Sequence, residues 1–190
     1  MGCKLTQSIT KEECLYSVAG IKELYLLNYD SAIEYKTKGG TGDDKNYISQ
    51  ITLPTNDKAY KIDFVNNTAS FSDELAENGN GGKYRTHTVN FTLENYDYQT
   101  LNAGDGLSLG KFVAVLVDKK NNVVILGRNN GLSATSFNYA SGAAEADANG
   151  WTVILAGSEL EIAQRLVDES VISTLVANNG ETRSSMIITD

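Results

Sequence analysis

Residues 68–93, TASFSDELAENGNGGKYRTHTVNFTL, carry the clearest β-hairpin pattern in the chain. The second half alternates between apolar and polar residues, as expected for a strand buried on one face. The asparagine and glycine residues at 78–82 supply the turn. Near the tip, Thr86, His87 and Thr88 make both faces polar. We therefore expect an exposed His87 and a hairpin that extends beyond its own core, where a free edge favours pairing with another chain.

Strand-length apolar segments, separated by asparagine- and glycine-rich turns, continue on both sides of this hairpin. Asparagine–glycine pairs between apolar segments are typical of hairpin turns. The expected strands are residues 18–29, 47–53, 59–65, 112–117, 123–126, 132–139 and 151–156, with a last apolar run at 171–176.

Two short helices are expected between these strands. The first covers residues 94–103, with Tyr98 and Leu101 buried and Gly104 ending the helix. The second covers residues 160–169, because Ser158 and Glu161 have the spacing of a capping box. The pattern predicts a mainly-β sandwich or barrel with one or two flanking helices. Its domain covers residues 18–177, between an N-terminal arm at 1–17 and a C-terminal arm at 178–190.

Composition excludes several classes of function. The chain has 190 residues, and its 24 acidic and 16 basic residues give a net charge of −8. That balance argues against a cationic surface for nucleic-acid backbones. One histidine and two cysteines, Cys3 and Cys14, leave few ligands for transition metals. The longest apolar runs reach six residues, whereas a membrane helix needs about 20.

Each candidate motif for catalysis or cofactor binding in the chain lacks a residue that its chemistry requires. Residues 80–84, NGGKY, resemble a phosphate loop but lack the Ser or Thr after the lysine and the helix that follows. Residues 147–150, DANG, match part of a calcium loop, but Ala156 stands where the closing glutamate belongs. His87 has no serine or cysteine at a suggestive spacing. We therefore expect no enzyme activity, no cofactor and no bound metal.

The ten tyrosines point instead to an interface, since tyrosine combines apolar area with a hydroxyl group. Tyr84, Tyr96 and Tyr98 are the candidates, with scattered core and strand tyrosines as the alternative.

The chain resembles small virion structural proteins of tailed bacteriophages that infect Bacteroidetes, including crAss-like phages. The resemblance covers residues 18–176, and over this range the chain is similar in plan to tail-tube and neck-ring proteins. The segments that carry it are VAGIKELYLLN (18–28), FSDE (71–74), YRTHTV (84–89), FVAVLVD (112–118), LGRNNGL (126–132), SGA (141–143) and DANGWTV (147–153).

The resemblance implies a tail-tube-like β-sandwich in a closed homo-oligomeric ring of six or twelve copies, next to other tail, portal or ring proteins. Such a ring belongs to the tail or head–tail connector of the virion, is assembled in the host cytoplasm, and forms a conduit for genome ejection. DNA would pass without specific binding, because an acidic wall repels its phosphates. No membrane is involved.

The same resemblance suggests two sets of site residues. The hairpin that would pair with a neighbouring subunit contributes Phe71, Tyr84, Arg85, His87 and Val89. The acids that would face the lumen are Asp43, Asp44, Asp73, Glu74 and Glu77.

An alternative from another class is a carbohydrate- or protein-binding β-sandwich module of a tail fibre or surface adhesin. Trp151, Tyr96 and Tyr98 would then form an aromatic platform for a sugar.

Overall fold

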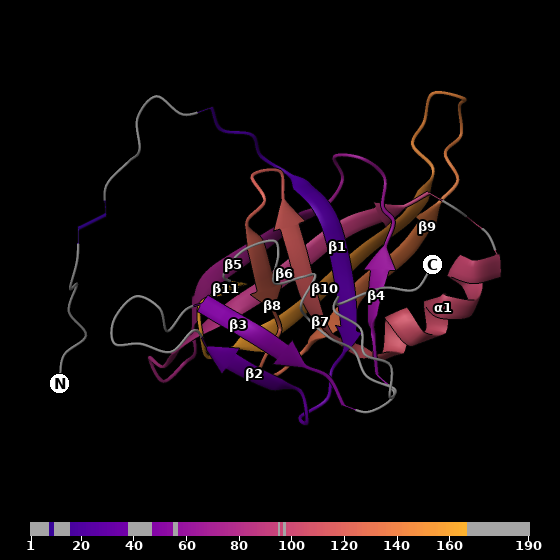
Figure 1. Ribbon diagram of the computed structural model, residues 1–190. Helices are drawn as coiled ribbons and strands as arrows, with labels where there is room; N and C mark the ends of the chain where they lie inside the picture. Colours follow the sequence, from indigo (N-terminus) through magenta and orange to yellow (C-terminus); the bar gives the residue numbers. More distant parts are fainter. Residues whose placement is uncertain are drawn as a thin grey trace.

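The computed structural model describes residues 8–9, 16–37, 47–54, 57–94, 96 and 98–166. Within these residues the chain forms eleven strands and one helix (Figure 1). Their bounds are β1 (Ile21–Asn28), β2 (Glu34–Thr37), β3 (Tyr47–Thr52), β4 (Ala59–Ile62), β5 (Ser70–Glu77), β6 (Lys83–Leu93), α1 (Tyr98–Leu109), β7 (Lys111–Asp118), β8 (Val123–Leu126), β9 (Leu132–Ala140), β10 (Gly150–Glu159) and β11 (Gln164–Leu166). The prediction of a mainly-β fold with a short helix is confirmed. The predicted C-terminal arm lies outside the described residues, as does most of the N-terminal arm.

Strand β7 is the centre of the fold, and its residues 112–117 are all apolar and all buried. One edge of β7 pairs with β1. The other edge is shared, because β9 pairs with Lys111 and Phe112 while β8 pairs with residues 114–117. The sheet therefore divides at β7. One branch runs through β8, β11, β3 and β2, and the other through β9, β10, β6 and β5.

A separate apolar cluster lies on each face of the β1–β7 pair. Tyr25 and Leu27 of β1 belong to a cluster with Ile48 and Ile51 of β3. The alternate residue Leu26 belongs to a second cluster, with Leu24, Val89 and Phe91 of β6, and Leu155 of β10. The β1–β7 pair is thus a middle layer. Burial on both faces explains why residues 112–117 form a continuous apolar run rather than an alternating pattern.

The predicted hairpin exists as β5 and β6, but it does not extend beyond the core as expected. Strand β10 pairs with β6 from Leu93 to Arg85, because it continues to Glu159, past the predicted end at residue 156. Only the residues at the tip project past this pairing. The expectation of an exposed His87 is also wrong, since its relative exposure is 2%.

Helix α1 is displaced from its predicted position and buries a different face. Gly104 lies inside the helix and is buried, since a Cβ atom there would sit 3.2 Å from the Phe137 ring. Tyr98 and Leu101, predicted to be buried, are exposed. The glycine permits close packing of the helix rather than ending it.

The helix predicted at residues 160–169 is wrong where the structure describes it. Strand β10 occupies the chain up to Glu159, and residues 164–166 form β11. Glu159, which would begin such a helix, is buried and accepts hydrogen bonds from the backbone N–H groups of Asn129 and Asn130, at 3.1 and 2.9 Å. These tertiary hydrogen bonds outweigh the local capping signal. Residues 167–169 lie outside the described residues.

Candidate functional site

Strand β5 forms an open edge of the sheet. It pairs with β6 from Ser70 to Glu77, and no other strand of the described residues pairs with it. At the turn, the N–H of Asn78 donates to the carbonyl oxygen of Gly82 at 2.9 Å. Because hydrogen-bonded pairs alternate in an antiparallel ladder, this bond places the backbone groups of Leu75 and Glu77 on the side away from β6. An edge of this kind can accept another strand.

One exposed apolar side chain lies on this edge, and two more lie on the segment 160–163, which contacts Asp73 of β5 through Ala163. Leu75 is 59% exposed, and Leu160 and Ile162 are also exposed. The segment that carries the latter two is held at two points. Arg128 makes a bidentate ion pair with Glu161, and the N–H of Ala163 donates to Asp73 Oδ2 of β5 at 2.8 Å.

Asp73 connects β5 to β6 through charged contacts. Its Oδ1 atom accepts a hydrogen bond from Arg85 Nε at 2.7 Å. Burial opposes ionisation of this carboxyl group, but the hydrogen bonds from Arg85 and Ala163 and the nearby His87 outweigh it and hold the pKa of Asp73 below its ordinary value. Asp73 is therefore an ionised, internally paired group rather than a free acid.

This pairing predicts a pH-dependent contribution to stability. A lowered folded-state pKa stabilises the protein above the unfolded-state pKa of about 3.9, and the contribution is lost as the pH falls through the folded-state value. Asp73→Asn should lower the free energy of unfolding by about 2 kcal/mol at pH 7, and the difference from the wild type should shrink below pH 4. Urea denaturation at both pH values measures this. A difference that grows on acidification would contradict the assignment.

His87 is held in one tautomer by its neighbours. Its Nδ1 atom accepts a hydrogen bond from the N–H of Gly127 at 3.3 Å, so the proton of the neutral ring sits on Nε2. Nε2 lies 3.4 Å from Asp73 Oδ1, but makes no hydrogen bond to any described residue. The acceptor nitrogen is thus occupied by a structural contact. The arrangement anchors the 127–131 turn to β6 and leaves no free nitrogen lone pair for a general base.

The residues proposed for the subunit-pairing hairpin differ in how deeply they are buried. His87 and Val89 are buried within the chain, whereas Phe71 and Tyr84 are half-buried. Arg85 is paired with Asp73. Side-chain contacts with a neighbour are therefore limited to the less buried members of this set, and the edge that β5 offers is made of backbone groups.

The proposed lumen-facing acids are also placed differently from one another. Glu74 and Glu77 are exposed on β5, whereas Asp73 is paired with Arg85. Asp43 and Asp44 lie outside the described residues.

Part of the aromatic platform is assembled around Trp151. The Trp151 ring is stacked on Tyr96, with ring centroids 5.5 Å apart, and on Phe137, at 4.5 Å. Tyr139 adds a tilted contact at 5.2 Å. Tyr98 is 79% exposed and joins no ring contact among the described residues. Sequence reasoning missed Phe137 and Tyr139, although both lie at alternating positions on the strand that precedes Trp151.

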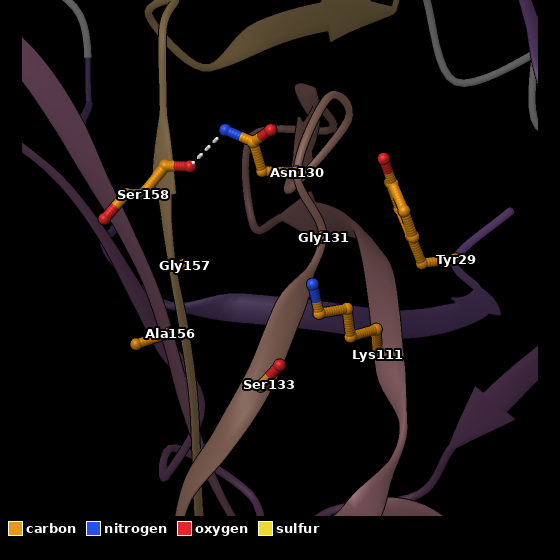
Figure 2. Close-up of a pocket in the computed structure, with 8 residues that line it drawn as sticks. All are labelled: Tyr29, Lys111, Asn130, Gly131, Ser133, Ala156, Gly157 and Ser158. Atoms are coloured by element: carbon orange, nitrogen blue, oxygen red, sulfur yellow. Dashed lines mark hydrogen bonds between the residues drawn. The ribbon is translucent and has the colours of Figure 1, made fainter. Parts of the chain in front are cut away.

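A pocket of about 470 Å³ lies near the 127–131 turn (Figure 2). It is lined by Tyr29, Lys111, Asn130, Gly131, Ser133, Ala156, Gly157 and Ser158. Sequence reasoning singled out none of these as a site, because they come from three strands and two connections that are distant in the sequence.

Other site classes find no support in the described part of the chain. It holds no group of three or more histidine, cysteine, aspartate or glutamate side chains placed to bind a metal ion. Its single helix is too short and too polar to cross a bilayer. Comparisons with protein-family models, curated proteins and solved structures found no match.

Proposed function

We propose that this protein is a virion structural subunit that assembles with copies of itself into a ring of a phage tail or head–tail connector. The observation that carries the proposal is the edge of β5, which pairs with β6 on one side and with no strand of the described residues on the other; of its outward backbone groups, the Asp73 carbonyl oxygen already accepts a hydrogen bond from Arg85 Nη2 at 2.9 Å. A strand from a neighbouring copy would complete this edge. When the neighbour contributes a different surface and the rotation between copies closes, this contact repeated head-to-tail around an axis forms a ring.

The surroundings of the edge support protein contact. Leu75 projects from β5 itself, and Leu160 lies on the segment whose Ala163 N–H donates to Asp73 of β5. Burying these side chains against a neighbour would contribute about 25 cal/mol per Å² of apolar surface removed from water. The edge thus offers both backbone hydrogen bonds and apolar area.

The charge of the chain supports a conduit for DNA. The net charge is −8 per copy, and Glu74 and Glu77 are exposed. A ring multiplies this charge, and an acidic wall does not neutralise phosphates, so a duplex would pass without adhering. The ring would have no enzymatic role and no cofactor.

Leu75→Pro tests the assembly edge. Proline lacks an N–H group and is tolerated on an edge strand only where that group faces away from the ladder. The N–H of Leu75 is not used by β6, so this variant should fold but lose ring assembly. Light scattering coupled to size exclusion, with negative-stain images, would show monomers in place of rings.

Leu75→Thr is the matched control, since it removes the leucine side chain but keeps the backbone donor. It should weaken assembly by about tenfold or less. A wild-type protein that is monomeric at all concentrations and absent from virions would overturn the proposal, and rings formed equally well by Leu75→Pro would show that β5 is not the contact.

The aromatic cluster favours a second candidate, a carbohydrate- or protein-binding module of a tail fibre or adhesin. Tyr96 and Tyr139 are exposed and in contact, with ring centroids 4.7 Å apart. Exposed aromatic rings of this kind are typical of sugar sites. Binding on a glycan array that is lost in Tyr96→Ala would support this function instead.

A further inference from the structure

The pocket lies where the two branches of the sheet separate. Strand β9 pairs with β10 as far as Ser133, opposite Ala156, and Ser133 also pairs with Lys111 of β7. Beyond this point β10 loses β9 as a neighbour and continues to Glu159 paired with β6. Figure 2 shows Lys111, Ser133 and Asn130 around the resulting hollow.

Lys111 gives this pocket a single positive charge. None of the eight lining residues is acidic. Lys111 forms no ion pair with a described residue, and its Nζ atom lies 6.0 Å from the centroid of the Tyr29 ring. The hydrogen bond from the Tyr29 N–H to the Lys111 carbonyl oxygen, at 2.9 Å, fixes the two residues side by side.

The neighbouring polar groups suit a small ligand. The Ser133 hydroxyl makes no hydrogen bond to a described residue and can donate into the pocket. The Asn130 side chain is held in place because its Nδ2 donates to the Ser158 carbonyl oxygen at 2.8 Å, which leaves Oδ1 as an acceptor. The pocket therefore offers one positive charge, the ammonium and hydroxyl groups as hydrogen-bond donors, and the oriented Asn130 Oδ1 atom as an acceptor.

The adjoining turn does not provide a phosphate cradle. Its N–H groups are already used, since those of Asn129 and Asn130 donate to Glu159 and that of Gly131 donates to the Gly127 carbonyl oxygen. Phosphate sites usually rely on several free backbone N–H groups or on arginine. The Lys111 ammonium group and the Ser133 hydroxyl group instead match a ligand that has two oxygen acceptors and one negative charge.

We propose that this pocket binds one carboxylate group, with the Lys111 ammonium neutralising its charge and Ser133 donating a hydrogen bond to it. The volume accommodates a group the size of a sugar acid. The carboxylate can come from a small molecule such as a uronate, or from an acidic side chain of another protein chain. None of the residues that line this site belongs to β5.

Titration calorimetry on the full chain tests the site, with glucuronate as the probe and methyl glucoside as its neutral counterpart, at constant ionic strength. Glucuronate should bind saturably and the neutral sugar should not. Lys111→Met should weaken glucuronate binding by about tenfold, the effect of losing one charge-assisted contact. Lys58→Met is the matched control, because Lys58 also lies over a tyrosine ring, that of Tyr60, but away from the pocket.

A second measurement distinguishes the two sources of carboxylate. If glucuronate fails to bind but Lys111→Met weakens self-association while Lys58→Met does not, an acidic side chain of another copy is the occupant. If neither glucuronate binding nor self-association responds to Lys111→Met, the proposal is overturned. Loss of the ring proposal would leave the calorimetric result intact, so the two can fail separately.

Discussion

Gly157→Ala is expected to destabilise the protein by about 3 kcal/mol, through overpacking. A Cβ atom at this position would lie 2.3 Å from the Gly131 carbonyl oxygen, well inside contact distance. The turn that carries Gly131 cannot easily move away from position 157 to relieve this contact. The N–H groups of Asn129 and Asn130 donate to Glu159, and Asn130 Nδ2 donates to the Ser158 carbonyl oxygen. We therefore expect a lower urea midpoint and a distorted pocket wall.

Gly79→Ala provides the matched control, because no heavy atom lies within 4 Å of a Cβ atom built there. Its free energy of unfolding should remain within about 0.5 kcal/mol of the wild type. Equal stabilities of the two variants would show that β10 and the 127–131 turn are not packed as closely as the structure has them.

Glu159→Ala is expected to lower the free energy of unfolding by about 3 kcal/mol. The side chain is 1% exposed, and its Oε1 atom accepts the N–H groups of Asn129 and Asn130. Hydrogen bonds to a charged acceptor stabilise more than neutral ones, and removing the acceptor leaves both donors without a protein partner. Because these bonds hold the 127–131 turn, the variant should also lose the pocket.

Two further variants separate the causes. Glu159→Gln keeps an oxygen acceptor and should lose less stability than the alanine variant. Glu74→Ala removes an exposed carboxylate from β5 and should change stability by less than about 0.5 kcal/mol. Urea denaturation of all three at pH 7 makes the comparison. If Glu159→Ala matched Glu74→Ala, the buried carboxylate would not stabilise the turn.

Alternating and continuous apolar patterns predicted most strands. The hairpin of β5 and β6 and the run at residues 112–117 were both recognisable. The alternating pattern of β6 indicates a strand buried on one face, and the continuous apolar run indicates a strand buried on both faces. Two short strands, β2 and β11, were not predicted. The β2 segment, EYKT, holds one aromatic residue among polar ones and shows no apolar alternation. Strand β11 has three residues, too few to show a period, and exists only because it lies between β3 and β8.

The candidate sites depended much more on contacts between distant segments. Glu159 has the local sequence of a helix start, yet its carboxylate accepts hydrogen bonds from the backbone of a turn some 30 residues away. His87 has polar neighbours that indicate exposure, yet it is buried, and its Nδ1 atom accepts a hydrogen bond from the Gly127 N–H. Neither partner could be identified from the residues next to them in the chain.

The amino-acid sequence by itself determined the class of the protein: an acidic, mainly-β chain whose strands and turns follow from the spacing of apolar, asparagine and glycine residues. That spacing is local, so it needs no knowledge of partners. Only the tertiary structure decided that β7 is shared by two branches, that β5 is left with an open edge, and that Lys111 and Ser133 meet at a pocket. Each of these results from the order in which strands pair, which depends on contacts between residues far apart in the sequence.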